Sequence, residues 1–549
     1  MQEKSLNMQL QDLSFKLDNE YIALDNDVML SIEVFSFDNV FHPRKGSLKK
    51  VENKYISHEL IWGGSEFEPN SFVELEVGKE NNTYSFNLKA GLNQKVRETK
   101  LRFDNLPLGN LISTINGEHI TKEYGEILCY PEGWRSLMTP LLVFKLAKDK
   151  FLYFRSLDNK VRQKRFYIKK TSEKTMTVEL LYEENGKDMS NSVSVPTWEY
   201  GYVSFEKEIY EKHTKFLEKT YQYVKYENRK DVPNWFKDVS LIVICHMEHW
   251  TGHIFHTYEQ ALEDFKKLTK YIDPKHVLFY IPGWEGRYYY KYGNYTADDR
   301  LGGPTKLKEF VDGVHSLGGH VMSMVGLTMA NTSLPDYEKW GKPSEFVLAS
   351  GATFNHGSVD WDGSRHYDHH VNSQLTPAAP GWQKKILDEI VRSTKEYGFD
   401  GVFLDIAAAY NNDSRYEITK GVFEVAKKLN ETFDNYLVSG EGFYDGMMMS
   451  MPLFQSGHTD GLMHYHDSVY EKMFSDYGRE FSHLCLGDLS YGSSGVHELG
   501  INSTDVKTPY RKGLIPTLTL VNGTLDNALD KVLEVVDDAK KYAKEFLNK

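Results

Sequence analysis

The chain has 549 residues, of which 40% are hydrophobic and 26% are charged, so it is long enough for two or three globular domains. Its formal net charge of −13 argues against a nucleic-acid partner, because nucleic acids select basic surfaces. No apolar run approaches the length of a membrane span, and we therefore expect no membrane partner.

The first part of the chain has the rhythm of short β-strands. Apolar or alternating runs occupy residues 28–35, 71–77, 141–146 and 176–182, and turn residues such as 80–82 and 184–186 separate them. This pattern predicts an antiparallel β-sandwich over residues 1–204. The charged segment 205–223 then predicts a helix, which begins a helical linker that ends at residue 234.

After Pro233 the pattern changes to apolar strand, loop and amphipathic helix. The strand candidates are 241–246, 277–282, 320–327, 401–405, 436–441, 461–467, 484–489 and 514–521. The helical candidates are 258–272, 305–317, 382–397, 417–433 and 525–548. This alternation predicts a (β/α)8 TIM barrel over residues 235–549. The connection at about 328–381 is unusually long and carries histidines between 356 and 370, which suits a lid or a substrate wall.

Two of the predicted barrel strands end in a carboxylate. The strand 401–405 ends at Asp405, and the strand 436–441 ends at Glu441, which glycines flank on both sides. In a TIM barrel the carboxyl ends of the strands form the rim that carries the active site. Glycosidases use a pair of carboxyl groups for catalysis, so two of them at that rim indicate a glycosidase. A separation of about 5–5.5 Å between the two groups supports a retaining mechanism. The alternative roles are structural: a helix cap or ion-pair partner for Asp405, and a turn residue for Glu441.

The arrangement with Asp at the end of the fourth strand and Glu at the end of the fifth resembles that of the retaining α-glycosidases of the α-amylase-like superfamily. Endo-α-N-acetylgalactosaminidases and dextranases share this arrangement. A β-sandwich before the barrel is similar to these enzymes and to the α-galactosidase-like group. The resemblance implies an α-linked glycoside, with Asp405 as nucleophile and Glu441 as acid/base. It also implies a third carboxylate that binds substrate hydroxyls, for which Asp467 is the first candidate and Asp488 the second.

Two features depart from these families. The α-galactosidase-like group takes its acid/base from an Asp at the sixth strand, which would make Asp467 the acid/base in place of Glu441. The amylase-like pattern has Arg two residues before the nucleophile, where this chain has Phe403. Asp405 is therefore the firmer member of the predicted catalytic pair.

Further candidate substrate contacts follow the other strands. The loop after the second strand carries Trp284 as a possible sugar platform, together with Glu285 and Arg287. His246, His464 and His466 are the remaining candidates. An alternative function is a metal-dependent barrel hydrolase that uses these three histidines. A third is a carbohydrate-binding protein with a degenerate barrel. The first strand lacks an HxH pair, which favours hydrogen-bonding histidines over metal ligands.

The remaining expectations concern cofactors and location. We expect no metal and no cofactor, with a carbohydrate as the binding partner; the sequence does not indicate an oligomeric state. The cysteines Cys129, Cys245 and Cys485 are far apart and form no CxxC pair, and residues 1–6 do not begin a signal peptide. These features predict a cytoplasmic enzyme with free thiols.

Overall fold

The structure is a computed structural model that describes residues 20–63, 66–114, 117–131, 137–249, 252–353, 355–356, 372–455, 469–482, 510–520 and 523–547. The chain divides into two compact units. One comprises Met1–Pro131 and Thr139–Phe216, and the other comprises Glu132–Met138 and Leu217–Lys549. Within the described residues, none of the helices combines the length and the apolar character that crossing a membrane requires.

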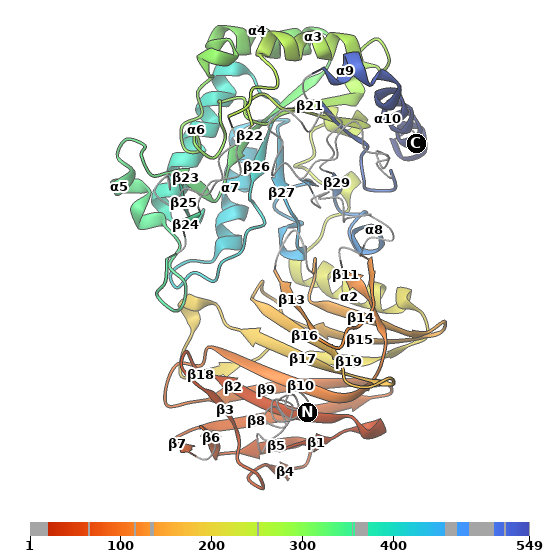
Figure 1. Cartoon of the computed structure of the whole chain (residues 1–549), viewed down its shortest axis with the longest axis vertical. Coiled ribbons are helices and arrows are strands. Elements are labelled where there is room, and N and C mark those ends of the chain that lie inside the picture. The colour runs from red at the N-terminus through yellow and green to blue at the C-terminus, as the bar shows by residue number, and fades with distance from the viewer. Residues whose placement is uncertain are drawn as a thin grey trace, which may run out of the picture. The chain divides into compact units, whose positions relative to one another are not determined.

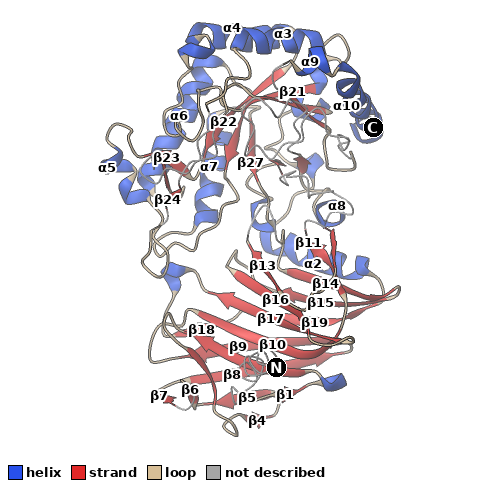
Figure 2. Ribbon diagram, in the orientation of Figure 1, coloured by secondary structure: helices blue, strands red, loops and turns tan. Residues whose placement is uncertain are grey.

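The first unit contains two antiparallel sheets (Figures 1 and 2). The first sheet consists of β1 Ile22–Ala23, β2 Met29–Phe35, β3 Val40–Pro43, β6 Leu60–Trp62, β7 Glu66–Glu68, β10 Glu98–Pro107, β13 Glu126–Tyr130, β16 Lys164–Lys170 and β17 Thr175–Glu183. Its order is β13-β16-β17-β10-β2-β3-β6-β7, and β1 pairs with β2.

The second sheet consists of β4 Lys49–Val51, β5 Lys54–Ser57, β8 Phe72–Glu80, β9 Thr83–Gly91, β11 Asn110–Thr114, β12 Gly117–His119, β14 Leu141–Ala147, β15 Lys150–Ser156, β18 Ser192–Ser194 and β19 Trp198–Val203. Its order is β12-β11-β14-β15-β19-β9-β8-β5-β4, and β18 pairs with β9. The predicted antiparallel β-sandwich is thus confirmed, and each of its four quoted runs forms a strand.

Aromatic rings fill the space between the two sheets. The ring of Phe103 on β10 lies 5.2 Å from Phe86 on β9 and 5.6 Å from Tyr200 on β19, so rings of both sheets share one core. Alternation along β9 places Phe86 inward, because successive side chains of a strand point to opposite faces. Helix α2 (Glu206–Tyr221) follows β19, where the charged segment predicts it.

The second unit is a (β/α)8 TIM barrel. Its eight parallel strands are β20 Leu241–Cys245, β21 Val277–Ile281, β22 His320–Gly326, β26 Gly401–Asp405, β27 Leu437–Glu441, β28 Leu453–Gln455, β29 Arg479–Phe481 and β30 Thr517–Leu520. The sheet order follows the chain, and β30 pairs with β20. On the other side of the sheet, an isolated parallel bridge joins Glu480 of β29 to Leu514, which precedes β30. Most of these strands are buried along their whole length, and β20 and β21 are also apolar throughout, as parallel strands under helices require.

Helices surround this sheet (Figure 2). They are α3 Tyr258–Leu268, α4 Gly303–Ser316, α5 Tyr337–Trp340, α6 Pro380–Tyr397, α7 Ile418–Thr432, α8 Val469–Met473, α9 Thr524–Asn527 and α10 Leu529–Tyr542. The long third connection contains α5 and a small sheet of β23 Met329–Asn331, β24 Asn355–His356 and β25 Asn372–Gln374. Most of its histidine-rich part, 357–371, lies outside the described residues.

Two strand predictions are wrong. The sixth and seventh places of the barrel are taken by β28 and β29, whereas the sequence predicts 461–467 and 484–489 there; those two ranges lie outside the described residues. Each observed strand is only three residues long, and β29 contains Arg479 and Glu480, so neither has the apolar run of a buried strand. The single predicted helix 525–548 is instead divided into α9 and α10 at Ala528, whose backbone is not helical.

Candidate active site

Two buried carboxyl groups lie next to each other where strands β26 and β27 end. The strands run parallel with Leu404 opposite Gly440, so the residues that follow, Asp405 and Glu441, reach the same rim. Asp405 is 7% exposed and Glu441 is 8% exposed. Buried carboxylates are rare unless they are paired or serve a chemical purpose. The structure thus brings together the two residues that the sequence predicts as a pair.

Hydrogen bonds fix both carboxyl groups. The Tyr292 hydroxyl donates to Oδ2 of Asp405. The backbone N–H of Ile406 donates to Oε2 of Glu441 over 2.9 Å. The side chains of Asp405 and Glu441 are close enough for each to influence the ionisation of the other, so a proton bound to one of them is favoured.

The surroundings of the two carboxyl groups favour a bound proton. Burial raises the pKa of Asp405 well above its usual value, and the charge of Glu441 raises it further. The hydrogen bond from Tyr292 acts in the opposite direction. Because two adjacent buried carboxylates repel each other, the first proton leaves the pair far more readily than the second. The result is one ionised and one protonated carboxyl group at the same pH.

Ile406, whose N–H binds Glu441, has a strained backbone. Ile406 follows Asp405 and has a φ of 59°, which is an outlier for a β-branched residue and costs of order 1–3 kcal/mol. This conformation directs its N–H to Glu441, while its carbonyl accepts a hydrogen bond of 3.2 Å from Thr328 Oγ1. Such strain gathers at functional sites. The sequence does not reveal it, because Ile406 reads as an apolar residue in an apolar run.

Buried tyrosines surround the carboxyl pair. Burial raises the pKa of Tyr280, Tyr289, Tyr292 and Tyr295 well above the usual value, and the charge of Asp405 contributes, so each hydroxyl remains a donor. A Cβ at Gly326 would lie 2.1 Å from the ring of Tyr292. A glycine at the end of β22 is therefore what allows Tyr292 to reach the site.

The loop after β21 differs from its prediction. Trp284 is completely buried, and its indole N–H donates to the Met324 carbonyl over 2.9 Å. Its ring packs against Tyr397 and Phe399 at 5.7 and 5.1 Å. Trp284 therefore belongs to the core and offers no ring face to a sugar, contrary to the expectation of a platform. Arg287 is partly exposed, and its guanidinium lies 3.7 Å from the centre of the Tyr290 ring.

Glu285 is a fully buried acid. Within the described residues, neither of its carboxyl oxygens has a hydrogen-bond partner. Burial raises the pKa of Glu285 to about 8, and the charge of Glu248 contributes. Glu248 is itself buried and forms an ion pair of 2.6 Å with Arg300. The raised pKa favours the uncharged form of Glu285 at neutral pH.

The histidine candidates divide into two groups. His246 follows β20, is 4% exposed and lies in a ring cluster with His249 at 6.3 Å and Phe255 at 6.0 Å. The other candidates, His464, His466, Asp467 and Asp488, lie outside the described residues. In the part of the chain that the structure describes, no group of three or more His, Cys, Asp or Glu side chains is placed to hold a metal ion.

Gln455 is a polar residue of the rim that the sequence pattern does not predict. Gln455 ends β28 and stands opposite Glu441 in the β27–β28 register. Its strand is too short to be recognised from a pattern, and the preceding Leu453 and Phe454 give only two apolar residues as a signal. The structure therefore adds an amide to the rim.

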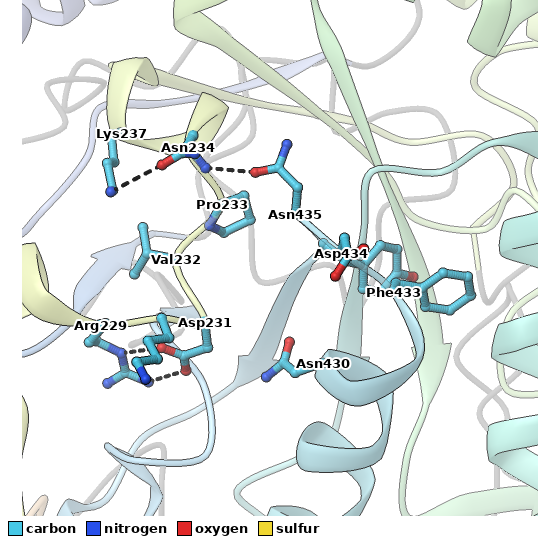
Figure 3. A pocket seen from close by; sticks show the side chains of 12 residues that line it. Arg229, Asp231, Val232, Pro233, Asn234, Lys237, Asn430, Phe433, Asp434 and Asn435 are labelled. Carbon is cyan, nitrogen blue, oxygen red and sulfur yellow. Dashed lines mark hydrogen bonds and ion pairs between the residues drawn. The ribbon is translucent and has the colours of Figure 1, made fainter.

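A separate cavity of about 420 Å³ lies at the other end of the barrel (Figure 3). It is lined by Arg229, Lys230, Asp231, Val232, Pro233, Asn234, Lys237, Asn430, Phe433, Asp434, Asn435 and Tyr436. These residues precede β20 and β27, so the cavity is at the amino ends of the strands. The N–H of Asn234 donates to Asn435 Oδ1 over 2.8 Å across it. TIM barrels place active sites at the opposite face, so this cavity is not the candidate active site.

The comparisons with known proteins concern the fold. Neither a protein-family description nor a curated protein matches the sequence. Solved structures do match. The α-N-acetylgalactosaminidase NagBb from Bifidobacterium bifidum, in its GalNAc complex, has a TM-score of 0.65 at 10% identity, over 96% of this chain and 91% of that chain. The α-galactosidase from Lactobacillus brevis has a TM-score of 0.51 at 12% identity, over 95% and 72%.

The galactosidase domain of the α-galactosidase-sucrose kinase AgaSK has a TM-score of 0.52 at 12% identity, over 94% of this chain and 72% of that chain. At these identities the likeness establishes the fold alone. This chain shares with these proteins a fold in which an antiparallel β-sandwich is followed by a TIM barrel.

Proposed function

We propose that the protein is a retaining glycoside hydrolase that acts on an α-linked sugar, with Asp405 as nucleophile and Glu441 as acid/base. The observation that carries this proposal is the pair of adjacent, buried carboxyl groups at the carboxyl ends of β26 and β27. The solved structures that share the fold are named as an α-N-acetylgalactosaminidase and α-galactosidases, which favours a galactose-type sugar as substrate.

Both steps require the proton of the pair to lie on Glu441 and the charge on Asp405, the form that the hydrogen bond from Tyr292 favours. Ionised Asp405 attacks the anomeric carbon while the glycosidic C–O bond breaks, and Glu441 gives its proton to the leaving oxygen. Glu441 is then ionised and takes a proton from water, whose oxygen attacks the anomeric carbon as the bond to Asp405 breaks. The sugar and the free enzyme result, with the proton back on Glu441.

The proximity of the two groups supports retention. An inverting enzyme holds its carboxyl groups roughly 6.5–9.5 Å apart, so that a water molecule fits between one of them and the sugar. Asp405 and Glu441 end neighbouring paired strands and interact directly, which favours the shorter separation of a retaining enzyme.

Chemical rescue tests both roles at once. A screen of aryl α- and β-glycosides would first identify the substrate. For an α-glycoside, azide should replace the lost nucleophile of Asp405→Ala and yield the β-glycosyl azide. In Glu441→Ala, azide should attack the glycosyl-enzyme and yield the α-glycosyl azide.

Asp434→Asn, in the cavity at the other end of the barrel, is the matched control and should retain wild-type rates. Wild-type turnover by Asp405→Asn, or the same azide anomer from both alanine variants, would exclude the assigned roles.

A further inference from the structure

The side chain of Gln455 lies in the same layer of the barrel as the two carboxyl groups. Glu441 and Gln455 are opposite each other in the parallel pairing of β27 and β28, so their side chains project to the same face. The N–H of Gly442 donates to the Gln455 carbonyl over 2.7 Å, which holds the end of β28 against the residue that follows Glu441. Gln455 is 1% exposed.

The carboxamide of Gln455 is unsatisfied. Among the described residues, neither Oε1 nor Nε2 has a hydrogen-bond partner. Burying an unpaired amide is unfavourable, and folded proteins rarely do so without a ligand or an ordered water. Another buried glutamine shows the usual arrangement, because Oε1 of Gln374 accepts a hydrogen bond of 3.0 Å from Asn411.

We propose that Gln455 is a substrate-contact residue that binds a polar substituent of the sugar held by Asp405 and Glu441. The carboxamide presents one acceptor and two donor hydrogens. A sugar hydroxyl both donates and accepts, and an acetamido group offers an N–H and a C=O, so either satisfies the amide. The inference rests on the proposed function for the position of the sugar.

The isosteric variant Gln455→Met separates a substrate contact from a structural role. Methionine keeps the volume and removes both hydrogen-bonding atoms. If the amide serves the substrate, the melting temperature should stay the same or rise, because an unsatisfied polar group leaves the interior. The kcat/KM should fall about tenfold or more, because the substrate loses a hydrogen bond.

Gln374→Met is the matched control for stability. It removes an amide that already has a protein partner, so its melting temperature should fall. A lower melting temperature in Gln455→Met as well would assign its amide to structure and overturn the proposal.

Deoxy analogues of the substrate identify the contacted group. The loss caused by Gln455→Met should shrink to within about twofold for the one analogue that lacks this group, as in a double-mutant cycle. An equal loss with every analogue would overturn the proposal.

Calorimetric titration of galactose and N-acetylgalactosamine into the wild type and Gln455→Met measures the contact without turnover. A Kd about tenfold weaker in the variant is expected for at least one sugar. An equal Kd, or no binding to the wild type, would overturn the proposal. Unchanged turnover in Asp405→Asn would reject the proposed catalytic roles. A weaker Kd in Gln455→Met would support the Gln455 contact even then.

Discussion

The pKa of Asp405 depends on opposing effects of its neighbours, and single substitutions can remove one neighbour at a time. Burial and Glu441 favour the protonated carboxyl, and the hydroxyl of Tyr292 favours the ionised one. Attack on the substrate needs the ionised form. We therefore predict that Tyr292→Phe raises the pKa of Asp405 and moves the acid limb of kcat/KM upward by about one pH unit, the scale of a hydrogen bond to a charged group. The pH profile of kcat/KM measures this shift.

Tyr295→Phe is the control for that experiment. The Tyr295 hydroxyl accepts a hydrogen bond of 2.8 Å from the N–H of Gly326 and does not bind Asp405. Its removal should leave the acid limb in place. If both variants moved the limb equally, the effect would belong to packing and not to the hydrogen bond on Asp405.

The buried acid Glu285 should make the stability of the barrel depend on pH. The pKa of Glu285 is about 8 in the folded protein, against 4.5 for an ordinary glutamic acid. The folded state then binds the proton more tightly than the unfolded state, so its contribution to stability is complete below about pH 4.5 and is lost as the pH rises to about 8. Each pH unit of this difference corresponds to about 1.4 kcal/mol.

Glu285→Gln removes this titration. Relative to the wild type, the variant should gain stability as the pH rises from 5 to 8, and the difference should level off above pH 8. Thermal unfolding of both proteins across this range measures the difference. A constant difference would show that Glu285 titrates normally.

At the scale of elements, helix α3 is held to the end of β20 by a buried histidine. Nδ1 of His256 donates to the His246 carbonyl over 2.7 Å, and Nε2 lies 3.2 Å from Asp264 on α3. Burial lowers the pKa of His256, but Cys245, Asp264 and the His246 carbonyl outweigh it and raise the pKa to about 10. His256 is thus a charged histidine in the interior at neutral pH.

Replacing this histidine should cost stability in a pH-dependent way. His256→Gln leaves Asp264 without its buried partner, and we expect a loss of about 3 kcal/mol near neutral pH. The ordinary pKa of His is 6.5, so the contribution of the charged ring is complete below that value and is lost as the pH rises through about 10. Chemical unfolding from pH 6 to 10.5 should show the wild type and variant converging, whereas parallel curves would contradict a charged His256.

Elements with a long apolar run could be predicted from the sequence, and short ones could not. The strands that carry Asp405 and Glu441 have five buried residues each and end where expected. The three-residue strands β28 and β29 could not be found, because their position depends on pairing with their neighbours and not on their own composition. The error moved the predicted sixth strand to 461–467 and hid Gln455.

At the scale of the whole molecule, the order of the units was predictable and the detailed chemistry of the rim was not. Alternating apolar and polar residues predicted the sandwich, and a repeated strand–helix pattern predicted the barrel. The interaction of Tyr292 with Asp405 and the burial of Trp284 depend on how one loop folds over the rim. No local pattern separates a tryptophan that stacks on sugar from one that fills a core, because both need an apolar ring.

The net charge of −13 gives a final prediction about the substrate. A neutral glycoside is neither attracted nor repelled at long range, so its kcat/KM should change by less than about twofold between about 20 mM and about 500 mM salt. A sulfated analogue of the same glycoside meets a negative field, and its kcat/KM should rise with salt as the repulsion is screened. Initial rates of the two substrates in parallel salt series test this. A kcat/KM for the sulfated analogue that falls with salt would reveal a cationic substrate site, which would favour an anionic sugar as the natural substrate.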